Sequence, residues 1–411
     1  MMTAMTRIRI LFEHLVTMAG AGEYRHGEIV IEEGRVQAIR DGVSPSFVGK
    51  TIDLSDHLIL PGFVNTHCHL ALSALQIQKQ PKFTDWIEQV VAANKALTWH
   101  NRIQGIHQGA DTLVRSGVTT LADYLSHPDL LVEYSRLPLR QVLFLETLGF
   151  KSDQAASVAH NLDRIFKNHA SSGGKMRLGL APHAPYSVSP ALFKEIRRLA
   201  DHYRCPVSCH VAEVPEEVQF LRQGDGDFQS LLKRRGVYDA AWRPAGLTPV
   251  KYLAQMGVLD SMLCVHLNHV EADLDLLADR GAKAAFCPGS TCWFGRPAWM
   301  PVKALWDRGV PVGLGTDSLA SNESLNFLRE IRLAETLVPD MSRRDILTLA
   351  TRGGSEALGL DCGVLAPGRP ADLIGFRLTK PGGSWADIPF APEREAVDFS
   401  MIQGEICAIP G

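Results

Sequence analysis

The fold is decided by residues 58–69, whose sequence is Leu-Ile-Leu-Pro-Gly-Phe-Val-Asn-Thr-His-Cys-His. The apolar part of this stretch predicts a buried β-strand, and two histidines stand at its end. Side chains two residues apart in a strand point to the same face, so His67 and His69 can direct both imidazoles to one point. A His-x-His pair alone is more typical of an ordinary strand end that faces solvent. The rest of the chain has to decide between these interpretations.

Seven further short apolar segments follow this strand, and patterns typical of amphipathic helices separate them. Near-continuous apolar strands predict a parallel sheet that is buried on both faces. Eight such units within about 300 residues favour a (β/α)8 barrel, similar to a TIM barrel, over a doubly wound sheet, which would carry Gly-x-Gly-x-x-Gly after its first strand. The further strands are predicted at 117–123, 140–146, 176–183, 205–213, 262–267, 282–288 and 310–317, with helices at 103–116, 153–169, 190–203, 215–234, 271–280 and 322–337.

Both ends of the chain have the pattern of short antiparallel strands. Residues 26–39 predict a hairpin whose turn can use Gly34 for a positive φ, and residues 363–376 return to a strand-like pattern. Residues 342–358 predict one more helix before that return. We therefore expect a small composite β-sandwich domain built from 1–58 and 360–411, and a catalytic barrel over 59–359.

Composition places the chain among ordinary folded proteins. Of its 411 residues, 45% are hydrophobic and 21% are charged, and the formal net charge is −3. This charge indicates no nucleic-acid partner, and no run of apolar residues is long enough to indicate a membrane segment. Eight cysteines without a Cys-x-x-Cys pattern are typical of reduced thiols, so we expect a cytoplasmic protein. A homodimer is compatible with these properties.

Polar side chains end five of the eight predicted strands. The carboxyl ends of the strands in a (β/α)8 barrel meet at one rim, where such enzymes carry their active sites. A lone histidine at a strand end usually bonds a backbone carbonyl, and an aspartate after Gly-Thr is usually a helix cap or turn residue, but five such ends in one chain favour a shared site. Three imidazoles and one carboxylate that converge suit Zn²⁺, or Fe²⁺ or Mn²⁺. The residues are His67 and His69, His183, His210 and Glu213, His266, and Asp317.

In their order along the chain, these motifs resemble the amidohydrolase superfamily, and within it the mononuclear-metal deaminases that act on adenine nucleosides and related heterocycles. The binuclear branch of that superfamily has a lysine at the end of the fourth strand, where this chain has Ala-Pro-His at 181–183. The resemblance therefore implies one divalent ion, most simply Zn²⁺. It is carried by residues 61–69, 182–186, 210–213, 266–269 and 315–322, and it implies that His67, His69, His210 and Asp317 are the metal ligands.

The resemblance also implies that Glu213 is an acid, that His266 lies beside the attacking water and that His183 contacts the substrate. Elementary chemistry agrees, because a metal site with an open position provides hydroxide at neutral pH. Hydroxide can attack an sp² carbon that bears an amino group. Asp317 can take the water's proton, Glu213 can protonate the ring nitrogen and His266 can hydrogen-bond the attacking oxygen. We expect a metal-dependent aminohydrolase with a small nucleoside-like substrate.

The sequence says less about which nucleoside is the substrate. Residues 287–295 and 315–322 are most similar to the aminofutalosine deaminases of menaquinone biosynthesis. The alternative is S-adenosylhomocysteine or methylthioadenosine, but deaminases of these nucleosides hold the ribose with a glutamate shortly after the equivalent of Trp86. This chain has Asn94 there. Trp86 is either a stacking platform for the purine or a core aromatic residue, and we expect Ser321 to contact the substrate.

Two other classes of function stay open. One is a different amidohydrolase reaction, such as guanine or cytosine deamination or the removal of chloride from a triazine. The other is a non-enzymatic scaffold of the kind known among relatives of dihydropyrimidinase. Such scaffolds tend to lose metal ligands, whereas this chain keeps all of them. The sequence therefore favours an enzyme.

Overall fold

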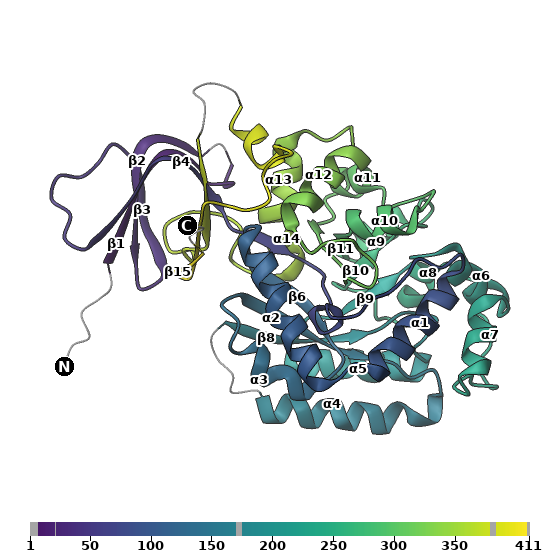
Figure 1. Ribbon diagram of the computed structural model, residues 1–411. Helices are drawn as coiled ribbons and strands as arrows, with labels where there is room; N and C mark the ends of the chain where they lie inside the picture. The colour runs from purple at the N-terminus through teal and green to yellow at the C-terminus, as the bar shows by residue number, and fades with distance from the viewer. Residues whose placement is uncertain (1–6, 21, 170–174, 379–383, 409–411) are drawn as a thin grey trace.

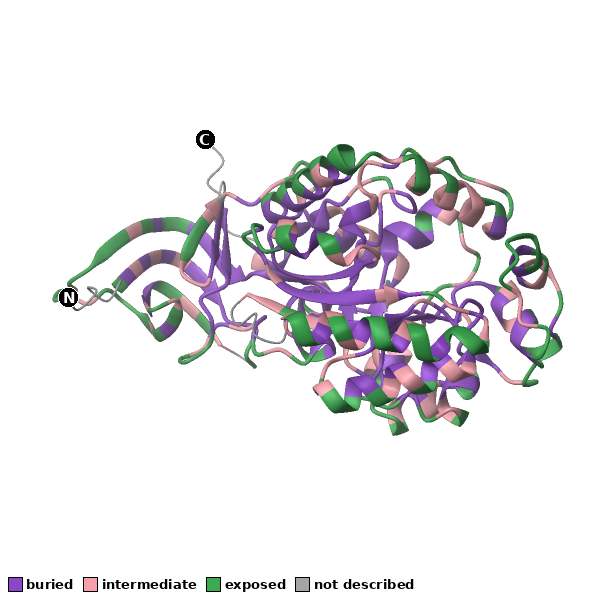
Figure 2. Ribbon diagram, turned by 90° about the horizontal axis from the view of Figure 1, so that it is seen from below, coloured by how far each residue is buried: buried purple, intermediate pink, exposed green. Residues whose placement is uncertain are grey.

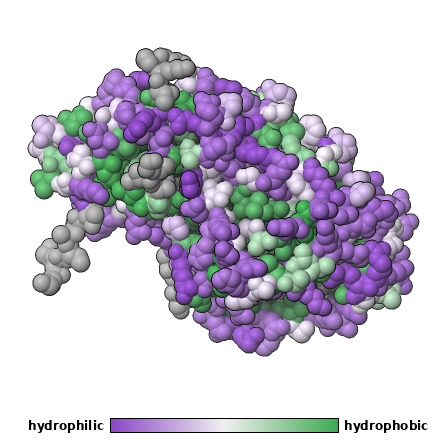
Figure 3. All heavy atoms as spheres, viewed as in Figure 1, coloured by the Kyte–Doolittle hydropathy of each residue, from purple (hydrophilic) through white to green (hydrophobic). Residues whose placement is uncertain are grey.

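A computed structural model describes residues 7–20, 22–169, 175–378 and 384–408. Their strands form an eight-stranded sheet and a seven-stranded sheet, and the second one combines strands from the N-terminal and C-terminal parts of the chain (Figure 1). Helices surround the first sheet, and its strands are buried while the outer helix faces are exposed (Figure 2). Hydrophilic residues cover most of the visible surface of this part (Figure 3). Among the described helices, none is both long and apolar enough to cross a bilayer.

The eight-stranded sheet is the predicted parallel barrel. Its strand order is β8-β7-β6-β5-β12-β11-β10-β9. A parallel bridge between Leu180 and Val207 joins the two ends of this order, and the Leu180 N–H donates to Pro206 O at 3.0 Å. The sheet is therefore closed, as expected for a (β/α)8 barrel. The strands are β5 (Phe63–Asn65), β6 (Val118–Leu125), β7 (Arg140–Thr147), β8 (Met176–Pro182), β9 (Ser208–Val211), β10 (Leu263–His266), β11 (Lys283–Phe286) and β12 (Val312–Leu314).

The prediction of one helix over 215–234 was wrong. The chain forms α6 (Pro215–Gln223) and α7 (Asp227–Arg234) instead. Gly224, in the left-handed conformation with φ of 79°, ends α6, and Gly226, with φ of 87°, precedes α7. The helix predicted at 322–337 begins only at Phe327, because Asn326 caps it and the residues before it form a loop at the barrel rim.

The other predicted helices are present, and several further helices were not expected. The expected ones are α2 (Trp99–Arg115), α4 (Ala155–His169), α5 (Pro190–Tyr203), α9 (Leu274–Asp279), α12 (Phe327–Leu337), and α13 (Arg343–Thr348) with α14 (Gly354–Leu358), which a π-helical turn (Leu349–Gly353) joins. The additional ones are α1 (Phe83–Ala96), α3 (Leu131–Tyr134), α8 (Pro249–Gln255), α10 (Pro288–Phe294) and α11 (Val302–Asp307), with 3₁₀ turns at Leu70–Leu72, Pro128–Leu130, Ser152–Gln154 and Trp385–Phe390.

The seven-stranded sheet combines both chain ends, as predicted. It is one continuous sheet, and its core gathers apolar side chains from N-terminal and C-terminal strands alike. The hairpin predicted at 26–39 is present, with Gly34 at φ 73° in its turn. The predicted domain boundary at residue 58 stays a prediction. Strand β4 of this sheet ends three residues later, at Pro61. In order across the sheet the strands are β15 (Glu405–Ala408), β14 (Phe399–Ile402), β13 (Leu373–Arg377), β4 (Lys50–Pro61), β1 (Arg7–Val16), β2 (Glu23–Glu32) and β3 (Arg35–Asp41).

Gly62 connects the two sheets, because it joins β4 to β5, the strand that leads to His67 and His69. A Cβ atom at this position would lie 2.1 Å from Thr119 Oγ1, so only glycine allows β5 to approach β6 this closely. The Phe63 N–H then donates to Gly117 O at 2.9 Å. This contact places β5 in the barrel and carries its end to the rim.

Candidate metal centre and active site

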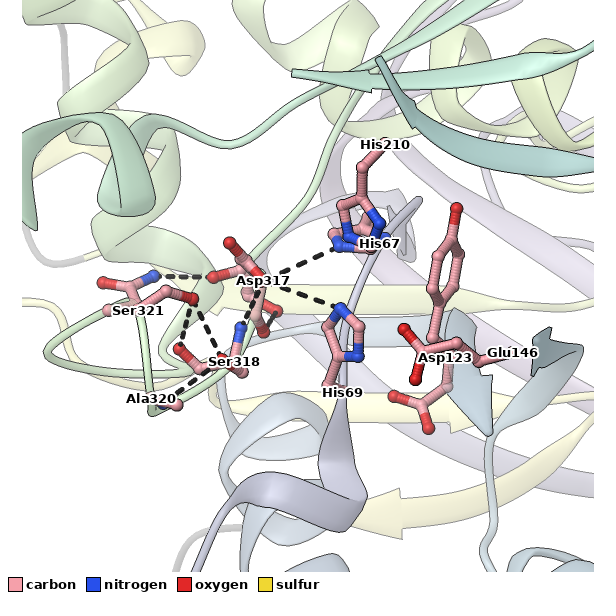
Figure 4. A network of polar contacts seen from close by, with 12 residues as sticks. His67, His69, Asp123, Glu146, His210, Asp317, Ser318, Ala320 and Ser321 are labelled. Carbon is pink, nitrogen blue, oxygen red and sulfur yellow. Dashed lines mark hydrogen bonds and ion pairs between the residues drawn. The ribbon is translucent and has the colours of Figure 1, made fainter. Parts of the chain in front are cut away.

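The ends of β5 and β12 bring three of the predicted ligands together. A parallel bridge pairs Cys68 with Asp317, and the N–H groups of Thr316 and Asp317 donate to His67 O at 3.0 and 3.1 Å. Asp317 Oδ1 lies 3.6 Å from His67 Nε2 and 3.8 Å from His69 Nε2. Figure 4 shows this carboxylate facing both imidazoles. Backbone pairing between the neighbouring strands β5 and β12 therefore sets the distance between these side chains.

His210, at β9, supplies the third imidazole. Its Nδ1 donates to the carbonyl of His183 at 2.9 Å, which leaves Nε2 free for a metal. The centroids of the His210 and His67 rings are 4.9 Å apart. Candidate ligand atoms of His67, His210 and His266 lie within 4.8 Å of one another, as do those of His67, His69 and Asp317. His67 belongs to both groups and so brings His210 close to His69 and Asp317, while the role of these four side chains as ligands stays a prediction.

The donor groups present fit a divalent cation. His67 is fully buried, yet neither of its ring nitrogens has a hydrogen-bond partner among the described residues. An unsatisfied buried polar atom costs about 1–3 kcal/mol, and a metal bound at Nε2 would remove part of that cost. Burial, with the neighbouring His67, lowers the pKa of His69 to about 4, so this ring is in the neutral form that binds metals. Three imidazoles and one carboxylate suit one divalent ion such as Zn²⁺.

The backbone at the rim is strained. Ala212, His266, Leu267 and Asp317 have φ of 53°, 75°, 48° and 57°, a left-handed conformation that non-glycine residues rarely adopt. Each such residue costs of order 1–3 kcal/mol, and such strain clusters at functional sites. Here it turns three strand ends sharply, so that side chains after the strands still face the centre.

The predicted proton-transfer group, Glu213, lies beside this centre. Its Oε1 is 3.6 Å from His266 Nε2 and accepts from Arg296 Nη2 at 2.5 Å. Burial raises the pKa of Glu213 to about 7, and Arg296 opposes this rise. A carboxyl group that titrates near neutrality can both give and take a proton under physiological conditions.

The predicted substrate contacts lie on loops and helices around the centre. His183 is partly exposed at the end of β8, with Nδ1 2.7 Å from Ser187 Oγ. Trp86 on α1 donates from Nε1 to Ala320 O at 2.8 Å and stacks on Phe83, which makes α1 part of the rim. The hydroxyl of Ser321 is buried and lies 2.9 Å from Ser318 Oγ. Contacts of His183, Trp86 and Ser321 with a substrate stay predictions.

Three polar residues of the rim were missed in the sequence. Asp123 and Glu146 end two of the predicted strands, so the strand-end criterion could have found them. Asp123 accepts from Leu70 N at 2.8 Å, and Glu146 lies within 4.8 Å of candidate ligand atoms of His183 and His210 (Figure 4). The third residue is Arg296, which lies in a loop, and no sequence signal distinguishes it.

Comparisons with known proteins show the family to which the chain belongs. The model of the amidohydrolase family matches residues 58–407. The chain is 30% identical over 380 residues to the 5'-deoxyadenosine deaminase of Methanothermobacter thermautotrophicus, covering 88% of this chain and 83% of that protein. It is also 30% identical over 427 residues to a 5-methylthioadenosine/S-adenosylhomocysteine deaminase of Pelotomaculum thermopropionicum, covering 98% and 93%.

Two solved structures share the fold. Helicobacter pylori aminofutalosine deaminase in complex with methylthio-coformycin has a TM-score of 0.85 at 22% identity, covering 98% of this chain and 100% of that one. A zinc-bound adenosine deaminase from Xanthomonas campestris has a TM-score of 0.84 at 23% identity, covering 98% and 93%. The chain belongs to the amidohydrolase family. Within this family it is a metal-dependent hydrolytic deaminase.

Proposed function

We propose that this protein replaces the 6-amino group of an adenine nucleoside, modified at its 5′ position, by a 6-oxo group and releases ammonia. The observation that carries the proposal is the convergence of His67, His69, His210 and Asp317 next to the buried carboxyl of Glu213. Relatives that are 30% identical are deaminases of 5'-deoxyadenosine and of methylthioadenosine or S-adenosylhomocysteine, which supports a nucleoside of this kind.

In this proposal His67, His69, His210 and Asp317 hold one divalent ion, which when bound makes hydroxide available by lowering the pKa of water to about 7. Asp317 accepts the proton that the attacking water loses. Glu213, as the acid, protonates the ring nitrogen next to C6, so negative charge does not build up there. His266 donates a hydrogen bond to the oxygen that adds to C6. The amino group then takes a proton and leaves as ammonia.

Within this class we propose aminofutalosine as the preferred substrate. The support is the resemblance of residues 287–295 and 315–322 to aminofutalosine deaminases. These two segments meet at the rim, because Glu330 accepts from Gly289 N and from Asn322 Nδ2, both at 2.7 Å. A thioether nucleoside is the second candidate, which the relatives favour.

The residue aligned with the ribose-binding glutamate of thioether-nucleoside deaminases is Asn94. It lies eight residues beyond Trp86 on α1, and its carbonyl accepts from Arg102 Nη2 at 3.0 Å. An amide side chain lacks the charge with which a carboxylate holds two hydroxyl groups. Asn94 therefore weighs against the thioether nucleosides.

The test is ammonia release by the zinc-loaded protein from aminofutalosine, methylthioadenosine, S-adenosylhomocysteine, 5′-deoxyadenosine and adenosine, with guanine, cytosine and a chlorotriazine alongside. The ratio kcat/KM compares how well each transition state is bound. We expect turnover of adenine nucleosides, with the highest kcat/KM for aminofutalosine. Preference for a thioether nucleoside would replace the proposed substrate. Turnover of only guanine, cytosine or the triazine would contradict the proposed class.

A further inference from the structure

Both the backbone N–H and the backbone carbonyl of Glu213 form hydrogen bonds with side chains of other residues. The N–H groups of Ala212 and Glu213 donate to the two carboxyl oxygens of Glu217, each at 3.0 Å. The carbonyl of Glu213 accepts from Asn268 Nδ2 at 3.1 Å and from Arg296 Nη1 at 2.8 Å. Glu217 is fully buried in the first turn of α6, so solvent does not compete for these bonds. We call Glu217, Asn268 and Arg296 the Glu213 frame.

Arg296 is the member of the frame that also reaches the carboxylate. One of its Nη atoms donates to Glu213 O and the other to Glu213 Oε1, at 2.8 and 2.5 Å. Its guanidinium lies over the rings of Phe294, at 4.4 Å from the centroid, and Phe83, at 5.6 Å. The Arg296 side chain is 8% exposed. Aromatic contacts and two parallel hydrogen bonds thus fix the guanidinium and, through it, the carboxylate.

The Glu213 frame stabilises a strained stretch of backbone. Ala212 has φ of 53°, and this conformation turns the chain so that Glu213 faces His266. A strained backbone conformation of this kind persists only when surrounding contacts hold it in place. The Glu217 carboxyl group holds the N–H groups of residues 212 and 213, and Arg296 holds the Glu213 carbonyl.

We propose that Glu217 and Arg296 are positioning residues for proton transfer by Glu213. Glu217 sets the backbone at residues 212–213, and Arg296 sets the direction of the carboxylate and compensates its buried charge. The inference rests on the proposed function, because it takes Glu213 as the group that moves the proton. The inference also gives α10 and α1 a role, because their residues Phe294 and Phe83 hold the guanidinium of Arg296, which orients the Glu213 carboxyl group.

The first test is a double-mutant cycle on the substrate with the highest turnover. Arg296→Met keeps an apolar side chain over Phe294 but removes both hydrogen bonds, and we expect kcat to fall roughly 10- to 100-fold, with KM little changed. Arg296→Lys is expected to recover part of kcat. In a Glu213→Gln background, Arg296→Met should cause no further loss. An equal loss in both backgrounds, or no loss in either, would overturn the proposal.

The matched control for Arg296 is Arg243→Met. Arg243 is exposed, and its Nη1 also donates to two backbone carbonyls, of Ala240 and Trp242, at 2.7 and 2.9 Å. It should leave kcat unchanged. For Glu217→Gln we expect the same loss of kcat as for Arg296→Met, whereas Glu216→Gln in the same turn should have no effect. A loss of the same size in the two controls would show a general effect on folding and overturn the assignment.

A second readout does not depend on the substrate. Crystal structures of the zinc-loaded protein and of its Arg296→Met variant should differ in the position of the Glu213 carboxylate, while His67, His69 and Asp317 stay in place. A Glu213 carboxylate that keeps its position without Arg296 would overturn the proposal. If the unmodified protein deaminates none of the nucleosides, the proposed function fails, and these two structures still decide whether Arg296 positions Glu213.

Discussion

The two sides of the barrel rim are built in different ways. On the metal side, backbone hydrogen bonds between strand ends place the side chains: the bridge between Cys68 and Asp317 and the Thr316 N–H on His67 O set the distance between ligands. On the substrate side, side chains bond to partners in distant parts of the chain. Trp86 bonds Ala320, 234 residues away, and Arg296 bonds Glu213, 83 residues away.

Because of this difference, substitutions on the two sides should have different effects. Ligand geometry follows from the closed sheet, so a change in one ligand leaves the others in place and removes the metal. Side-chain contacts between loops and helices can be altered one at a time, so changes there adjust rate and substrate preference. The following predictions sharpen this contrast, from the largest effect to the smallest.

Loss of a metal ligand should have the largest effect. We expect His67→Ala or Asp317→Asn to lose the ion and to reduce kcat by roughly 10³-fold or more, because the attacking hydroxide is no longer available. Metal content measured by mass spectrometry, together with ammonia release, checks this. His202→Ala, on the exposed face of α5, is the control and should keep both. Full activity in the metal-free Asp317→Asn variant would contradict the assignment.

Glu213→Gln should lower kcat by about 10²- to 10⁴-fold while the metal stays bound, because an amide cannot transfer the proton. The pKa of Glu213, raised to about 7 by burial, also predicts a pH dependence. As the acid, Glu213 must be protonated, so kcat/KM of the unmodified protein, which reports the pKa values of the free enzyme, should fall as the pH rises through about 7. A pH profile of kcat/KM measures this. A profile that rises there would assign the acid role to another group.

Trp86→Phe should have a smaller effect than these changes. It keeps the aromatic contact with Phe83 and removes the 2.8 Å hydrogen bond to Ala320, which ties α1 to the loop after Asp317. A neutral hydrogen bond contributes about 0.5–1.5 kcal/mol, which corresponds to a change of roughly 2- to 13-fold in kcat/KM. We expect the change mainly in KM, with metal content unaffected. Loss of the ion in this variant would show that the two sides of the rim are not independent.

Glu330 predicts a pH effect on stability rather than on activity. Burial raises its pKa to about 7, although the hydrogen bonds from Asn322 and Gly289 oppose this. Because the folded pKa is above the ordinary value, the contribution is present at low pH and is lost as the pH rises through about 7. Relative to Glu330→Gln, the unmodified protein should lose roughly 2–3 kcal/mol of unfolding free energy from about pH 5 to about pH 8.

Urea unfolding at each pH checks this prediction. The half-exposed Glu335 is on the same helix, and Glu335→Gln is the control that should follow the unmodified protein. A difference between Glu330→Gln and the unmodified protein that does not change with pH would show that Glu330 is ionised throughout.

The sequence predicted the barrel because its eight strands are apolar on both faces, and the ligands because they directly follow such strands. The same criterion would have found Asp123 and Glu146, had it been applied to every strand end. Helix α10 was not predicted because it is buried on most sides, including at Gly289, Ser290 and Trp293, so it lacks the polar face that gives a helical period. The break at Gly224 is visible in the sequence, but only its positive φ makes it the end of a helix.

Arg296 shows what the sequence could not supply. Its partner Glu213 and its ring contact Phe83 are on different elements, and only the packing of α1 against the rim brings all three together. No local sequence pattern predicts this contact, since it depends on how segments that are far apart in the chain pack together at the rim.

Anomalous diffraction at the zinc edge on crystals of the zinc-loaded protein tests the central claim most directly. We predict one ion, bound by His67, His69, His210 and Asp317, with an occupancy that follows the rate of ammonia release. An ion bound instead by Glu146 and His183, or full deaminase activity in crystals and solutions free of metal, would contradict it.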